Sequence, residues 1–169
     1  MHLAQLNIAH LRAPIDSPEL AAFVDALEPI NALADAAPGF VWRLKEDPNQ
    51  PRLTVKHEFG DHLLINFSIW ESLESLWNYV YKTQHLDFLR RRREWFQRMA
   101  EPTMVMWWIP EGTIPIPAEA MERLQRLKAE GPSPMAFTYK DSYSSEEALA
   151  FMNAPLRQGQ GPAATSRNS

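Results

Sequence analysis

Alternating apolar and polar residues predict a series of short β-strands, and the clearest of them covers residues 63–70. Alternate side chains of a strand share a face, which places Ile65, Phe67 and Ile69 on one face and Leu64, Asn66, Ser68 and Trp70 on the other. The first face is typical of a hydrophobic core. The second combines an amide, a hydroxyl and an indole, a mixture typical of a small cavity that holds a ligand of mixed polarity. A water-facing strand would instead favour Lys, Glu and Thr in place of the leucine and the tryptophan.

The same alternation predicts four further strands, the third less regular than the others, at residues 3–8, 40–44, 53–59 and 103–109. The first of these carries amides on one face, because Gln5 and Asn7 lie two residues apart. The last is apolar on both faces, so both faces should be covered. Trp107 and Trp108 in this strand point to opposite faces, and the alternation leaves open which of them faces a cavity.

Helical spacing of apolar residues predicts helices at residues 18–38, 72–85, 86–99 and 118–130. Ser17 followed by Pro18 is typical of a helix start, and Pro29 should kink the first helix or split it in two. The second helix carries an apolar stripe that we expect to face the core, formed by Leu73, Leu76, Trp77, Val80 and Tyr81. A short extended piece at residues 135–139 follows the last helix.

The order strand, helix, strand, strand, two helices, strand predicts an α+β fold, the ferredoxin-like split βαβ arrangement with a four-stranded antiparallel sheet. Helices cover one face of such a sheet and leave the second face bare. If the bare face carries Leu3, Asn7, Leu64 and Trp70, it is too apolar for water. A second copy of the chain would then close it, giving a homodimer. We expect one domain at residues 1–140 and a C-terminal tail at 141–169, largely disordered after residue 154.

Composition narrows the choice of partners. A chain of 169 residues with 45% hydrophobic residues can bury a core of its own. Its net charge of -4 argues against nucleic acid and against anionic membranes as partners, since both require a basic excess. The chain has no Cys, which excludes disulfides, thiolate nucleophiles and Cys-ligated metals. No signal peptide and no membrane span is recognisable, so we expect a cytoplasmic protein.

Several separate motifs then carry a resemblance that covers about residues 3–140: Asn66-Phe-Ser-Ile-Trp-Glu-Ser-Leu-Glu-Ser-Leu, His85, Arg91–Phe96, Trp107–Gly112, Arg123-Leu124 and Gly131–Phe137. In this order they resemble the DUF3291 family, which is related to the dimeric α+β barrel superfamily. The resemblance implies that barrel fold. Relatives in the wider superfamily include antibiotic-biosynthesis monooxygenases that need no cofactor, heme-degrading monooxygenases and proteins with no known reaction.

The resemblance also implies candidate site residues. Asn66 and Trp70 resemble the Asn and Trp with which cofactor-free monooxygenases hold an aromatic polyketide phenol, the amide binding an oxygen and the indole stacking on the ring. Related monooxygenases often carry a His near the position of His85, which could act as general base. The alternative for the first two is a buried Asn and a core Trp, and for the third a hydrogen-bonded structural His.

A second group of residues completes the prediction, as substrate-binding residues: Asn7, Gln5, Arg43, Tyr79, Ser68 and Trp107. Asn7 resembles an Asn of heme-degrading relatives. Their helix Trp falls at Tyr79 here and their heme-ligating His at Leu89, which disfavours heme, so we expect no cofactor. His57 and His62 lack a second ligand at metal-binding spacing, so we predict no metal site. The run Arg90 to Arg93 is expected to be mostly solvated or paired, because its members spread around the helix.

Two functions follow. The first is a small cofactor-independent monooxygenase-like enzyme that acts on a hydrophobic, oxygenated small molecule in a barrel cavity. The alternative is a dimer without catalytic activity, which either binds a small molecule in the same cavity or has a purely structural role. A cavity with Asn66 or His85 aimed into it would favour the enzyme or the binder over the structural dimer.

Overall fold

The computed structural model describes residues 1–45 and 62–154. Its elements follow the order β1 (His2–His10), η1 (Pro18–Leu20), α1 (Ala21–Asp35), β2 (Phe40–Arg43), β3 (Leu63–Trp70), α2 (Leu73–Lys82), α3 (His85–Trp95), β4 (Met104–Ile109), α4 (Pro117–Glu130) and α5 (Ser145–Asn153). The predicted strand at 53–59 and His57 lie outside the described residues.

The four strands form one antiparallel sheet in the order β2-β3-β1-β4. With a helix between β1 and β2 and two helices between β3 and β4, this is the predicted α+β fold with ferredoxin-like topology. The register places Asn7 opposite Asn66 and Gln5 opposite Ser68. Because side chains alternate across a sheet, these four residues share one face. The predicted extended piece also adds to the sheet, since Phe137 exchanges two backbone hydrogen bonds with Met106 at 2.8 and 2.9 Å.

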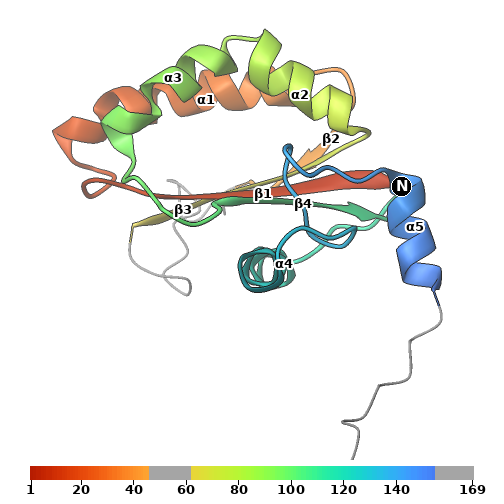
Figure 1. The fold of residues 1–169 in the computed structure, drawn as a ribbon. Helices are drawn as coiled ribbons and strands as arrows, with labels where there is room; N and C mark the ends of the chain where they lie inside the picture. Colours follow the sequence, from red (N-terminus) through yellow and green to blue (C-terminus); the bar gives the residue numbers. More distant parts are fainter. Residues whose placement is uncertain (46–61, 155–169) are drawn as a thin grey trace, which may run out of the picture.

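Helices lie on both sides of this sheet, with α1, α2 and α3 above it and α4 below it in the view of Figure 1. The face that carries Leu3 and Trp70 lies under α1 to α3, since both residues pack with Leu76 and Tyr79 of α2. The prediction that this face is bare was therefore wrong. The order of the elements predicts that the helices cover one face of the sheet. The alternation within a strand groups the residues by face but does not say which group lies under the helices. The argument from a bare face to a second copy of the chain loses its premise.

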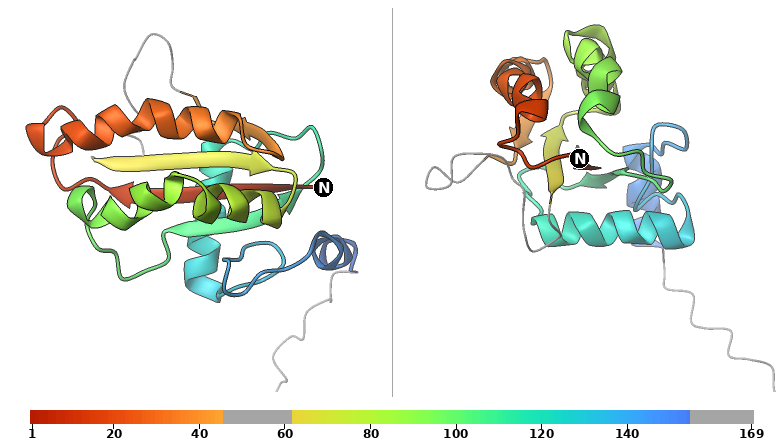
Figure 2. Two further views of the ribbon diagram at one scale, coloured as in Figure 1. Left: turned by 90° about the horizontal axis from the view of Figure 1, so that it is seen from above. Right: turned by 90° about the vertical axis from the view of Figure 1, so that its left-hand side faces the viewer.

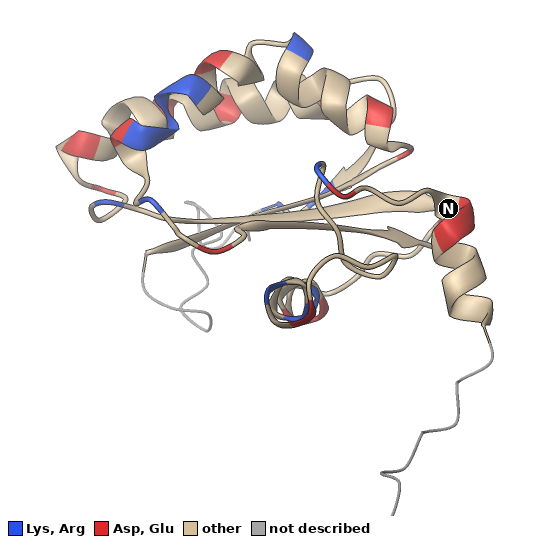
Figure 3. Ribbon diagram, in the orientation of Figure 1, with Lys and Arg blue, Asp and Glu red and all other residues tan. Residues whose placement is uncertain are grey.

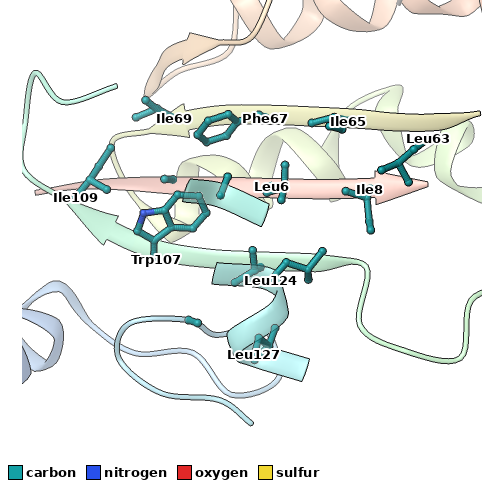
Figure 4. Close-up of a cluster of buried hydrophobic side chains, with 14 residues drawn as sticks. Leu6, Ile8, Leu63, Ile65, Phe67, Ile69, Trp107, Ile109, Leu124 and Leu127 are labelled. Atoms are coloured by element: carbon teal, nitrogen blue, oxygen red, sulfur yellow. The ribbon is translucent and has the colours of Figure 1, made fainter. Parts of the chain in front are cut away.

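The opposite face is covered within the same chain by α4. Leu124 and Leu127 of this helix pack on Leu6, Phe67 and Trp107 of the sheet, as Figure 4 shows. Phe67 and Trp107 stack with ring centroids 5.9 Å apart. Most of β1, β3 and β4 is therefore buried on both faces, which explains why β3 and β4 carry apolar residues at nearly every position.

The helix α1 departs from its prediction at two proline positions. Ser17 and Pro18 do begin the helical segment, but the first turn is a 3-10 helix and the Ser17 side chain makes no capping hydrogen bond. Pro29 lies inside α1, which runs without a break from Ala21 to Asp35. The expected split is absent. Packing holds the helix on both sides of the proline, since Phe23 packs with Trp95 of α3 and Ala34 packs with Trp70 of the sheet.

The helix α2 is rotated relative to the prediction. Ser72 caps it as expected, accepting a hydrogen bond from the Ser75 backbone N–H at 3.1 Å. Leu76 and Tyr79 are the buried residues of this helix, whereas Trp77 is 43% exposed and Tyr81 is 36% exposed. Part of the predicted apolar stripe is thus on the surface. The two exposed rings lie 4.2 Å apart between centroids, and both contact the ring of Tyr139.

Other boundaries lie close to the predictions, with two exceptions. The helix α3 starts at His85 and ends at Trp95, four residues earlier than expected. The helix α5 was not predicted; it begins with a capping box in which Ser144 and Glu147 exchange hydrogen bonds with each other's backbone N–H.

None of the helices in residues 1–45 and 62–154 has the length and the apolar run that crossing a membrane requires.

Among the glycines that the structure describes, Gly39 is expected to be the least tolerant of substitution. Its φ is +76°, and a Cβ atom there would collide with the Ser75 side chain. Gly112 has nearly the same φ, +77°, but open space around it. We expect Gly112→Ala to lower the free energy of unfolding by about 1 kcal/mol for the left-handed backbone alone. Gly39→Ala should cost about 1–3 kcal/mol more because of the collision. Urea denaturation of both variants checks this, and equal losses would contradict it.

Candidate functional site

The core between the sheet and the helices α1 to α3 is divided into two apolar clusters. One gathers around Trp70, Leu76 and Tyr79. The other gathers around Phe23 and Trp95, with Leu64 packed against it. Between Leu64 and Trp70 on the same face of β3 lie Asn66 and Ser68, and beside them on β1 lie Asn7 and Gln5. We call these four residues the polar band, and it is where the helix-side core is interrupted.

The polar band is accessible at one point. Asn66 is exposed although it lies in the middle of β3, and Asn7 opposite it is half-buried. In Figure 2 (left), β3 is seen between α1 on one side and α2 and α3 on the other. No side-chain hydrogen bond joins the amide of Asn7 or Asn66 to another of the described residues. Within the described part of the chain, neither amide has a side-chain partner that a ligand would have to displace.

Trp70 and Ser68, two of the predicted site residues, have structural partners. The indole N–H of Trp70 donates to Ser68 Oγ at 2.9 Å, and this hydroxyl donates to Gln5 Oε1 at 3.0 Å. Trp70 is 1% exposed, stacks on Tyr79 at 5.1 Å and meets the ring of Phe40 edge-on at 5.3 Å. The predicted stacking of Trp70 on a ligand needs a free ring face, and its environment leaves none. This interpretation of Trp70 is corrected to a packing role.

Tyr79 is held in a similar way. Its hydroxyl donates to the backbone oxygen of Ile30 in α1 at 3.2 Å, so the side chain ties α2 to α1. Burial raises the pKa of the Tyr79 phenol; the Arg43 charge lowers this pKa by a smaller amount and the Asp35 charge raises it further. The phenol is thus neutral across the physiological range. Tyr79 lies between Trp70 and His85, and its ring centroid is 4.8 Å from that of His85.

His85 is the first residue of α3 and is half-buried. Its Nδ1 lies 3.3 Å from the Val80 backbone oxygen. A carbonyl oxygen only accepts, so Nδ1 carries the hydrogen and Nε2 keeps a free lone pair. Desolvation lowers the pKa of His85 below its ordinary value of 6.5, partly offset by the hydrogen bond to Val80. A neutral imidazole with a free Nε2 is the form that can accept a proton.

The ring of His85 contacts both of the apolar clusters that flank the polar band. On one side its ring contacts Tyr79, which belongs to the Trp70 cluster. On the other side its ring centroid lies 6.0 Å from that of Phe88, which packs against Phe23 and Trp95 in the second cluster. His85 therefore stands in the helix layer between the same two clusters that the polar band separates in the sheet. The register of β1 and β3 places Asn66, Asn7 and Gln5 together on this face, and whether His85 acts with them stays a prediction.

Arg43 lies on the same face but is already paired. Its guanidinium binds both carboxylate oxygens of Asp35, at 2.8 and 3.2 Å. The hydrogen bond from Arg43 holds the pKa of Asp35 below its usual range. The sequence analysis missed Asp35, because it lies at the end of α1 and only the fold brings it to β2. If Arg43 binds substrate as predicted, it would use Nη1, which Asp35 does not engage.

Two other predictions concern residues away from the band. Trp107 lies on the α4 side of the sheet, with the Arg123 guanidinium 5.5 Å from its ring, so its predicted substrate-binding role is wrong for this site. Arg90 to Arg93 are exposed on the outside of α3 (Figure 3), and Arg91 pairs with Glu94 as expected. Among the described residues, no group of three or more His, Cys, Asp or Glu is placed to hold a metal ion.

Comparison with known proteins identifies the family. The family described as "Domain of unknown function (DUF3291)" matches residues 2–152. The chain belongs to the DUF3291 family. No curated protein matches the DUF3291 chain in sequence.

Two solved structures resemble the fold of this DUF3291 chain. One is SnoaB, a cofactor-independent oxygenase from Streptomyces nogalater, with 13% identity and a TM-score of 0.44, covering 68% of this chain and 98% of SnoaB. The other is a candidate antibiotic biosynthesis monooxygenase from Chloroflexus aurantiacus, with 16% identity and a TM-score of 0.41, covering 69% of this chain and 99% of that one.

The lowered pKa of His85 predicts a pH dependence of stability in the DUF3291 chain. The pKa of His85 is lower in the native state than in the unfolded state, so below pH 6.5 the unfolded state binds a proton at this residue more readily. Acidification should therefore favour unfolding. We expect the Tm of the wild type to fall more steeply than that of His85→Gln between neutral pH and about pH 5.5. Thermal melts at several pH values measure this. Parallel Tm curves for the two proteins would contradict it, and NMR titration of the ring would give the pKa directly.

Proposed function

We propose that this protein binds a hydrophobic, oxygen-bearing aromatic molecule between the sheet and the helices α1 to α3, and oxidises it with dioxygen without a cofactor. The observation that carries the proposal is the position of His85. Its ring contacts Tyr79 of one apolar cluster and Phe88 of the other, and these contacts support a position opposite the polar band. The amides of Asn66 and Asn7 have no side-chain hydrogen bond to a described residue. Two apolar clusters flank the band and would contact the ring system of the ligand.

His85 would act as the general base. It would remove a proton from a phenol, or from a CH₂ group next to an aromatic carbonyl, and its neutral state suits that role near pH 7. The amides of Asn66 and Asn7 would bind the ligand oxygen on which the negative charge collects. Dioxygen then converts the CH₂ group to C=O and its second oxygen atom leaves as water, so atoms and electrons balance without an added reductant.

The test is oxygen uptake with dithranol, a dihydroxyanthrone, compared with the spontaneous rate. We expect His85→Ala to lower the enzyme-dependent rate by about 100-fold or more, the usual contribution of a general base. Asn66→Leu should raise KM about tenfold for the loss of one hydrogen bond to a charged oxygen. The control is His10→Ala, since His10 lies at the far end of β1 and its side chain faces the opposite side of the sheet.

Two results would count against this proposal. Uptake that is unchanged in His85→Ala would remove His85 from the chemistry. Saturable binding of the anthrone without any enzyme-dependent uptake would favour the alternative, a small-molecule-binding protein without catalysis. In that case the loss of affinity in Asn66→Leu would still locate the ligand at the polar band.

We also propose that the chain forms a homodimer. Support comes from large apolar side chains that one copy leaves on its surface: Val41, Trp77, Tyr81, Ile114, Ile116, Leu149, Phe151 and Met152. Apolar residues in such number favour association when they form a patch. We expect sedimentation velocity at micromolar concentration to give a dimer, and the double variant Trp77→Ser, Tyr81→Ser to weaken it if α2 is in the interface. A wild-type monomer would contradict the proposal.

A further inference from the structure

The hydrogen bonds beneath the polar band determine which way the Gln5 amide faces. An indole N–H can only donate, so Ser68 Oγ accepts from Trp70. The hydroxyl of Ser68 has one proton, and it goes to Gln5 Oε1 at 3.0 Å. The carbonyl oxygen of the Gln5 amide is therefore engaged. The chain of hydrogen bonds from Trp70 through Ser68 ends at this amide, and its NH₂ group points away from Ser68.

This NH₂ group has no hydrogen-bond partner among the described residues. Gln5 is 7% exposed, and none of the described residues accepts a hydrogen bond from its Nε2. Gln5 Nε2 is not among the fully enclosed unpaired side-chain atoms of the described residues, so this amide keeps some exposure and can donate to a ligand. Gln5 lies two residues from Asn7 on one face of β1, and diagonally across from Asn66, a spacing of about 7–8 Å between Cα atoms. The free donor is thus in the band itself.

Charge around the band favours an oxygen that gains negative charge. None of the four residues of the band is ionisable. The carboxylate of Asp35, at the end of α1, is paired with Arg43 on this face through two hydrogen bonds. An anion formed at the band would meet amide donors. Such donors are worth more at a buried site than in water.

We propose that the Gln5 amide, oriented by Ser68 and Trp70, donates a hydrogen bond to the ligand and forms with Asn66 an oxyanion-binding site for a phenolate or enolate. The ligand class is accordingly an acidic phenol or an enolisable aromatic ketone. A ligand whose polar edge offers only donors would leave the Gln5 amide unpaired. This inference rests on the proposed function in assuming that a ligand occupies the band, but it concerns the state of the ligand before any oxygen reacts.

Binding of para-nitrophenol tests the inference without turnover, because its phenolate absorbs visible light. We expect the full-length wild type to lower the pKa of the bound phenol by about one to two units, the equivalent of hydrogen bonds to a charged oxygen. Gln5→Met keeps the length of the side chain and removes the donor, so it should abolish most of this shift. Gln5→Glu puts a carboxylate in its place and should reverse the shift. Gln125→Glu, the same substitution on the exposed side of α4, should leave it unchanged.

Each outcome is decisive. A bound phenol with an unshifted or raised pKa, an equal shift in wild type and Gln5→Met, or no binding of the phenol at all would overturn the inference. Circular dichroism identifies a variant that fails to fold, and Ser68→Ala then serves instead. It frees the amide to rotate and should reduce the shift without placing a charge in the core. Failure of the proposed oxidation is distinguishable, because oxygen uptake can be absent while the shift of the phenol pKa persists.

Discussion

A buried indole N–H has to find an acceptor, and in this protein the acceptor is a serine two residues earlier on the same strand. Because Ser68 accepts from Trp70, the ring lies against the sheet and presents a face to Tyr79. Tyr79 in turn fixes the distance between α1 and α2 through Ile30, and its other side contacts His85. The orientation of Gln5 follows from the same bond. The arrangement of the candidate site thus depends on one hydrogen bond inside the sheet.

The two faces of the sheet have different roles. The α4 face is a continuous apolar core in which Trp107 is fully buried. The other face has a core in two parts, and the polar band between them is where an amide is exposed in the middle of a strand. A core of this kind has fewer apolar contacts along its centre, where the polar band separates the two clusters. Binding sites are commonly built at such places, since a few polar groups within apolar surroundings orient a ligand.

Much of the fold follows from local periodicity. The alternation in β3 predicted its bounds and the two sets of residues on its faces, because a strand repeats every two residues whatever surrounds it. For the same reason Asn66, Ser68, Gln5 and Asn7 could be assigned to faces before their register was known. The order of elements was enough to predict the antiparallel four-stranded sheet.

The sequence by itself thus determined which residues share a face, since that is a property of the extended backbone. Only the tertiary structure decided which face lies under α1 to α3, because this depends on how distant segments pack. It placed Trp107 on the α4 side, buried both faces of the Trp70 ring and paired Arg43 with Asp35. It also left Trp77 exposed where helical spacing predicted core. Periodicity describes one segment, whereas burial is decided by what the rest of the chain brings against it.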